Sequence, residues 1–256
     1  MVIKLPKKGY RWFAALLHLF WSAILFSLIF ALLLGLWFPS PFYSASGGWQ
    51  ALKLVVIVLL LGPLLTLVVA NTLKARRVLA RDLGLIVGLQ CLALAWGAYL
   101  LHAQRPVAVV FWESEFYTVT ATELAEHGYS IDALDRFGQQ RPVWVYRPKP
   151  ADAEGLQAML KQVTVNQVPP HHQVASFLPY REHFSELAWH GVNIGEITRT
   201  NRNMQAELDE LLQQSGGKAD DYLYLALKSK YRNVVVVFTK SGERIGYLYA
   251  PYLRDA

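Results

Sequence analysis

Charged residues are scarce in this sequence, and cysteine is almost absent. Asp, Glu, Lys and Arg make up 17% of the 256 residues, against 54% hydrophobic residues, which is too apolar for an ordinary soluble protein. The single cysteine, Cys91, lies inside a long apolar run. The C-terminal part of the chain has no cysteine, so neither a disulfide framework nor a thiolate metal site can form there.

Acidic residues are nearly missing from the first 105 residues. This stretch has ten Lys or Arg and one acid, Asp82, whereas residues 106–256 have 15 Lys or Arg and 18 Asp or Glu. The net charge of +6 therefore comes from the apolar part, and the larger C-terminal part is slightly acidic. A nucleic-acid-binding protein concentrates positive charge on its folded domain, so we exclude that class and expect no nucleic-acid partner.

Three long apolar runs precede residue 102 and predict three transmembrane helices. They cover residues 13–38, 51–70 and 83–101, close to or above the roughly 20 residues that cross a hydrocarbon core. The first run is too long for the apolar core of a cleaved signal peptide, which has about 7–15 residues. Gly62-Pro63 predicts a kink in the second run, because proline lacks an N–H and crowds the preceding turn.

Basic residues predict which side of the membrane each segment occupies. The tail, residues 1–12, carries four Lys or Arg, and the segment between the second and third runs carries four more, whereas residues 39–50 carry none. The positive-inside rule places both basic segments in the cytoplasm. We therefore expect a cytoplasmic tail (1–12), a three-helix transmembrane domain (13–105) and a domain on the outer side (106–256).

Small residues recur along the third run with the spacing of a helix-packing seam. They are Gly84, Gly88, Cys91, Ala95 and Ala98. Small side chains let another helix approach closely in lipid. Two interpretations stay open: the seam packs against the first or second run of the same chain, or it forms a docking groove for the helix of a partner.

Few polar residues lie within or at the border of the apolar runs. They are His18, Thr66, Gln90 and Asp82. An ionisable residue inside a membrane is by default a functional candidate. Here we expect a neutral His18 near the tail and an Asp82 paired with nearby arginines, and we predict neither a proton relay nor an ion pathway.

Residues 106–256 predict one α+β domain with an antiparallel sheet, because strands come first, helices next and strands last. Segments rich in β-branched and aromatic residues predict strands at 107–112, 116–120, 143–146, 222–227, 234–239 and 244–249. Apolar periodicity and end signals predict helices at 122–128, 130–137, 152–163 and 203–214.

Catalytic signatures are missing from the sequence. It contains no G-x-S-x-G, P-loop, G-x-G-x-x-G or H-E-x-x-H motif. His171-His172 suggests a metal site, but adjacent residues on an extended strand point to opposite faces. Glu113 and Glu115 would share one face of a strand, where a solvated hairpin rim is the simpler interpretation. We expect no catalytic residue, no cofactor and no metal.

Four segments of the first 120 residues form an ordered set. They are Phe38-Pro39-Ser40-Pro41 with Gly47-Gly48-Trp49-Gln50, then Gly62-Pro63-Leu64-Leu65-Thr66-Leu67-Val68-Val69, Arg81-Asp82-Leu83 and Arg105-Pro106-Val107-Ala108-Val109-Val110-Phe111. In order and spacing the set resembles the type IV pilin accessory proteins of the TfpX/TfpZ family. The residues that we single out from it are Gly62, Pro63, Thr66, Asp82, Arg105 and Pro106.

This resemblance implies a non-enzymatic accessory protein or chaperone that promotes type IV pilus assembly. It implies a multi-pass protein of the bacterial inner membrane with a periplasmic C-terminal domain. The implied partners are the major type IV pilin, through its membrane helix and its head, other inner-membrane assembly components, and membrane lipid. The pilin helix would dock on the seam. Two alternatives stay open: a membrane-anchored periplasmic enzyme that modifies pilin, and a ligand-sensing membrane protein.

Overall fold

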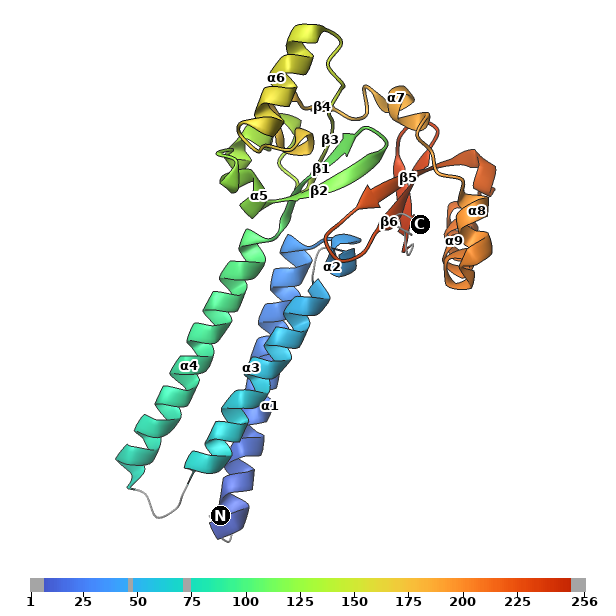
Figure 1. Cartoon of the computed structure of the whole chain (residues 1–256). Helices are drawn as coiled ribbons and strands as arrows, with labels where there is room; N and C mark the ends of the chain where they lie inside the picture. The colour runs from blue at the N-terminus through green and yellow to red at the C-terminus, as the bar shows by residue number, and fades with distance from the viewer. Residues whose placement is uncertain (1–6, 46–47, 71–74, 250–256) are drawn as a thin grey trace. The chain divides into compact units, whose positions relative to one another are not determined.

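The computed structural model describes residues 7–45, 48–70 and 75–249. It divides into two compact units, and most of their helices and strands are labelled in Figure 1. The helical unit comprises Met1–Pro39 and Gly48–His102. The sheet unit comprises Ala103–Ala256 together with the segment Ser40–Gly47, which comes from much earlier in the chain.

Three long helices form the helical unit. They are α1 (Lys7–Trp37), α3 (Gly48–Val69) and α4 (Arg76–Ala103), and each covers one of the predicted apolar runs to within one residue. Helix α3 packs along α1, and Pro63 lies inside α3 (Figure 1). A helix satisfies its backbone hydrogen bonds internally, so a continuous apolar run can form one even in lipid.

Two of the helices are long and apolar enough to cross a membrane. The segments Gly9–Trp37 and Arg77–Ala103 have 29 and 27 residues, more than the roughly 20 that a span needs. Only 18% and 11% of their most apolar windows are buried, which differs from the core helix of a soluble protein. The described part of α3 contributes a shorter apolar helix, Leu59–Val69. By length and composition, the structure thus supports two of the three predicted spans.

Seven strands form one sheet in the order β4-β3-β1-β2-β5-β6-β7. Their bounds are β1 (Pro106–Trp112), β2 (Glu115–Thr120), β3 (Val143–Tyr146), β4 (Leu178–Pro179), β5 (Tyr222–Lys228), β6 (Val234–Thr239) and β7 (Arg244–Leu248). The α-helices of this unit are α2 (Phe42–Ala45), α5 (Ala121–Glu126), α6 (Ala153–Thr164), α7 (Phe184–Ala188), α8 (Ile194–Thr200) and α9 (Arg202–Ser215). Its 3₁₀ turns are η1 (Ile131–Phe137), η2 (Pro170–His172), η3 (Val174–Ser176) and η4 (Ala219–Asp221).

The sheet is mixed, so the prediction of an antiparallel sheet is wrong. The pairs β1–β2, β5–β6 and β6–β7 are antiparallel neighbours in sequence. Strand β1, however, runs parallel to β3, and β2 runs parallel to β5. Short turns between strands reveal hairpins in the sequence, whereas the direction of a strand that returns through a long crossover depends on where it packs.

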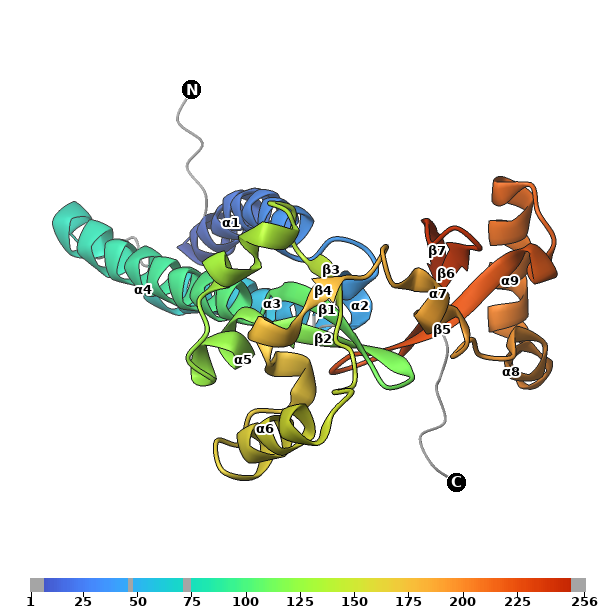
Figure 2. The same ribbon diagram turned by 90° about the horizontal axis from the view of Figure 1, so that it is seen from above.

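Helices and turns cover separate parts of the sheet. Figure 2 shows α5 and α6 beside β1–β3, and α8 and α9 beside β5–β7. One core cluster joins β1 and β3 to α5 and η1, and includes Val110, Leu124 and Leu134. A second joins α9 to β5–β7, and includes Met204 and Leu208. Every residue of β1 is buried, as expected for a strand with neighbours on both sides.

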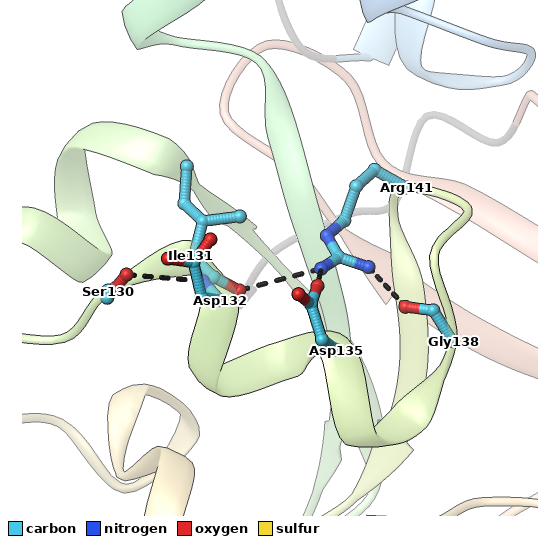
Figure 3. A network of polar contacts seen from close by, with 6 residues as sticks. All are labelled: Ser130, Ile131, Asp132, Asp135, Gly138 and Arg141. Atoms are coloured by element: carbon cyan, nitrogen blue, oxygen red, sulfur yellow. Dashed lines mark hydrogen bonds and ion pairs between the residues drawn. The ribbon is translucent and has the colours of Figure 1, made fainter.

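Arg141 connects turn η1 to the beginning of β3. Its guanidinium donates to the Gly138 carbonyl at 2.5 Å and to the Asp135 carboxylate, and it reaches the Ile131 carbonyl at 3.5 Å (Figure 3). Ser130 caps the turn, because its hydroxyl accepts the Asp132 N–H at 3.2 Å. These hydrogen bonds join residues within the connection from β2 to β3, and the polar groups are one another's partners. We therefore interpret the network as stabilising this connection.

The short segment between α1 and α3 belongs to the core of the sheet unit. Phe42, at the start of α2, is 1% exposed and lies in the largest core cluster, with its ring 6.5 Å from that of Trp144. The Ser40 hydroxyl forms a hydrogen bond with the Tyr247 hydroxyl on β7. The segment Phe38–Pro41, one of those that carry the resemblance, therefore leads directly into Phe42, which fills the core of the sheet unit.

Candidate functional site

The small-residue seam of α4 faces outward. Gly84, Gly88, Cys91 and Ala95 are exposed, and Ala98 is half-buried. A Cβ atom built on Gly84 or Gly88 would meet no other atom within 4 Å. Among the residues that the structure describes, the two glycines thus contact neither α1 nor α3, and the seam is open over most of its length.

The opposite side of α4 faces the other two helices. Ile86 and Gln90, one turn apart, are 7% and 6% exposed. An α-helix advances about 100° per residue, so Gly88 points about 160° away from Gln90, and Cys91 about 100° away. The buried and open faces of α4 are therefore distinct, and a polar side chain lies on the buried one.

His18, Thr66 and Gln90 form one hydrogen-bonded cluster across all three long helices. The His18 Nδ1 lies 2.6 Å from the Thr66 hydroxyl, and the His18 Nε2 lies 2.8 Å from the Gln90 Oε1. Because the Gln90 oxygen can only accept, the Nε2 donates to it. Both ring nitrogens of His18 therefore have a hydrogen-bond partner on another helix.

Gly62 and Thr66, which both lie in the segment 62–69 that carries part of the resemblance, support this cluster in different ways. Gly62 is buried, and a Cβ atom on it would overlap the Gln90 side-chain amide. Thr66 is 1% exposed and lies one turn further along α3. Pro63, between them, cannot donate a backbone hydrogen bond. Gly62 and Thr66 thus have a physical role that the sequence left unassigned: one accommodates Gln90 and the other contacts His18.

These three polar residues are evident from the sequence, but the sequence did not predict that they contact one another. A signal was present, since each lies in the half of its run nearest the predicted cytoplasmic end. Antiparallel neighbouring helices would bring residues of similar depth together. The missing information was which faces of the helices meet, because apolar runs without a polar face carry little information about rotation.

Asp82, Arg105 and Pro106, which were also singled out from the segments that carry the resemblance, have local structural roles. Asp82 pairs with Arg81 at 3.5 Å, which confirms the predicted pairing with a nearby arginine. The Arg105 carbonyl accepts the Ala121 N–H at 3.1 Å. Burial, and then the nearby charge of Arg141, lower the pKa of the Arg105 guanidinium. Pro106 is buried at the first position of β1, where a missing N–H is tolerated.

His171 and His172 lie in a histidine cluster of the sheet unit. They belong to the 3₁₀ turn η2 rather than to an extended strand, so their rings lie close, with centroids 4.5 Å apart. The ring centroids of His127 and His172 are 4.9 Å apart, and the Tyr117 ring stacks on that of His171 with centroids 4.4 Å apart. Among the described residues, no group of three or more His, Cys, Asp or Glu could hold a metal ion.

Burial determines the protonation of this histidine pair. It lowers the pKa of His171 to about 3, helped by His172, Lys228 and His127. It lowers the pKa of His172 to about 4, although the charge of Glu123 acts in the opposite direction. The His172 Nδ1 is buried without a hydrogen-bond partner in the described structure. Both rings are therefore neutral at pH 7.

Comparison with known proteins decides the family. The chain is 32% identical over 96 residues to the fimbrial assembly protein, serogroups C1 and C2, of Dichelobacter nodosus, and the match covers 73% of that protein. The chain belongs to the fimbrial assembly protein family. It is also 32% and 31% identical over 96 residues to the fimbrial assembly proteins of serogroups I and E1 of the same organism.

These matches extend over part of each protein. They cover 37% of this chain and 37% of the length of the serogroup I and E1 relatives. No model of a known protein family matches the chain. No solved structure matches it either.

Proposed function

We propose that this fimbrial assembly family member is an accessory protein or chaperone for the major type IV pilin in the bacterial inner membrane. The observation that carries the proposal is the 32% identity to proteins named for fimbrial assembly, over 73% of one of them. Two helices of membrane-spanning length and a separate folded unit suit a partner that has a membrane helix and a folded head.

The packing of Phe42 supports three spans and a periplasmic sheet unit. Phe42 shares a hydrophobic core with strands that follow α4, so its segment and the sheet unit lie on the same side of the membrane. Between them, α4 is long enough to cross, and α3 must then cross in the opposite direction. Together with the basic segments on the other side, this arrangement supports a cytoplasmic N-terminus and a periplasmic sheet unit.

The outward seam of α4 supports a role in binding the pilin helix. Without a hydrophobic driving force between helices in lipid, small residues promote association by allowing close backbone contact. Gly84 and Gly88 are open to such contact in the described structure. The pilin helix docks along Gly84, Gly88, Cys91, Ala95 and Ala98, and the pilin head contacts the sheet unit.

Deleting the gene is expected to abolish surface pili while pilin is still made. The measurement compares sheared surface pili with total cellular pilin by immunoblot, and the full-length chain on a plasmid should restore pili. Normal pili and normal pilin in the deletion strain would overturn the assembly role. The enzyme alternative would instead give pili whose pilin has an altered mass, and the sensor alternative would change the amount of pilin made.

Replacing Gly88 with leucine is expected to reduce co-purification of pilin by about three- to tenfold, because a large side chain prevents close helix contact. The matched control is Leu89→Phe, which enlarges a side chain that is already 53% exposed on another face of the same helix. Co-purification from detergent-solubilised membranes should fall only for Gly88→Leu. An equal yield from both variants would remove the seam from the proposal.

A further inference from the structure

Helix α4 has apolar side chains on most of its surface, so apolar contact alone does not determine its rotation. Leu85, Leu92 and Trp96 are 68%, 71% and 65% exposed. Lipid tails are as apolar as these side chains, so turning one apolar face toward α1 gains little over another. Something other than hydrophobic burial has to specify which face of α4 points outward.

The cluster of His18, Thr66 and Gln90 supplies that specification. A side-chain amide is costly in hydrocarbon unless it has a hydrogen-bond partner, and Gln90 finds one in the His18 Nε2 at 2.8 Å. The other ring nitrogen is held by Thr66 at 2.6 Å, so the imidazole cannot turn away freely. Rotating α4 would move Gln90 out of reach of this ring.

The fit around Gln90 is tight as well as polar. The amide occupies the space beside Gly62 that a Cβ atom would fill. Ile86, one turn away on α4, is 7% exposed and lies on the same face. A second contact occurs near the end of the helix, where the rings of His102 and Trp37 are 5.0 Å apart. Position 90 is therefore both hydrogen-bonded and sterically matched to its place.

We propose that His18, Thr66 and Gln90 are positioning residues that set the rotation of α4 and thereby present its small-residue seam to the pilin helix. The proposal rests on the proposed function for the identity of the partner. It adds that binding depends on Gln90, on the opposite face of α4, and on its partners His18 on α1 and Thr66 on α3, none of which touches the pilin helix. It also explains why a glycine lies at position 62 of α3.

The test measures rotation of α4 in the full-length protein in lipid nanodiscs, without pilin. A nitroxide spin label is attached to the native Cys91, or to cysteine in an Ile86→Cys, Cys91→Ser variant, and its collision rate with dissolved oxygen is recorded. In the wild-type background the label at position 91 should be accessible to oxygen in the lipid, and the label at position 86 should be protected.

Two independent variants remove the cluster. Gln90→Leu deletes the polar group, and Gly62→Ala displaces it while retaining every polar side chain. Both are expected to reduce the difference in accessibility between positions 86 and 91 by about half or more, as apolar contacts cannot replace the hydrogen bond. His18→Gln, which retains a donor and an acceptor, should preserve more of the difference than His18→Leu. Leu89→Phe serves as the control and should leave it unchanged.

Pilin co-purification from cells is the second readout. Reduced accessibility differences together with a loss of pilin binding in Gln90→Leu and Gly62→Ala would support the proposal. An unchanged accessibility pattern would overturn it, and so would an altered pattern with normal pilin binding. Neither of these outcomes would affect the assembly role, which depends on the deletion phenotype and on binding by the wild-type chain.

Discussion

Replacing Phe42 with alanine is expected to destabilise the sheet unit by about 3–5 kcal/mol, the usual cost of truncating a fully buried phenylalanine. The ring is 1% exposed and fills the cluster that includes Trp144, Phe116 and Phe238. Its removal leaves a cavity at the junction of β1, β2 and β3 with β5–β7. Such a loss is a large fraction of the whole stability of a typical domain, which is about 5–15 kcal/mol.

Hydrogen exchange of the full-length protein in detergent measures this effect where it occurs. Protection of the β1 and β5 amides should fall by about two to four orders of magnitude, since about 1.4 kcal/mol corresponds to a factor of ten. Phe42→Leu, which conserves most of the volume, should cost less than about 1.5 kcal/mol. Phe20→Ala is the matched control, because Phe20 is 57% exposed on α1 and belongs to the helical unit.

The same experiment tests how the segment between α1 and α3 relates to the C-terminal half. If protection of β1 and β5 is unchanged in Phe42→Ala, the segment does not contribute to the core. The packing of Phe42 would then no longer place the segment and the sheet unit on the same side of the membrane. A large effect would support both the packing and the three-span arrangement.

Acidification from pH 7 to pH 5 is expected to destabilise the sheet unit by about 2–4 kcal/mol through His171 and His172. Their pKa values in the folded protein are about 3 and about 4, whereas an unfolded histidine has a pKa of about 6.5. Between these values the unfolded chain binds protons that the folded chain excludes. The free energy of unfolding is therefore greatest above about pH 6.5 and falls as the pH drops toward about 4.

The surroundings of the pair explain the direction of this change. Lys228 and His127 oppose a positive charge on His171, and Glu123 only partly favours one on His172. The free energy of unfolding of the sheet unit is measured at pH 7.5, 6 and 5 by denaturant titration, with susceptibility to proteolysis as the readout. The double variant His171→Phe, His172→Leu should flatten it, whereas His190→Gln, at an exposed position, should not. An equally steep profile in the double variant would contradict the assignment.

Much of the secondary structure could be predicted from the sequence, because its signals are local. Long apolar runs indicated three helices, and β-branched and aromatic segments indicated the strands at 143–146 and 234–239, where β3 and β6 lie. The β6–β7 hairpin turns at Gly242, which has a φ of 86°, a conformation that glycine adopts without a steric cost. Each of these features depends on residues that are close in sequence, so no knowledge of distant contacts was needed.

The features that the sequence did not predict have a common physical origin, namely contacts between residues that are far apart in the chain. The parallel pairing of β2 with β5 and the placement of Phe42 beside Trp144 join residues that are far apart in the chain. No turn motif or periodicity encodes such pairs, because they follow from the packing of whole elements. The seam on α4 illustrates the limit: its spacing was visible in the sequence, but its outward direction was not.

By itself, the sequence determined the division into an apolar helical part and a part that mixes helices and strands, and the absence of known catalytic motifs. The direction in which the helices cross the membrane stays a prediction from the basic segments. The tertiary structure alone decided that a segment between two apolar helices completes the core of the sheet unit. It also decided that His18, Thr66 and Gln90 meet and leave the small residues of α4 facing outward. The reason is that periodicity records which residues share a face, whereas only packing determines what that face meets.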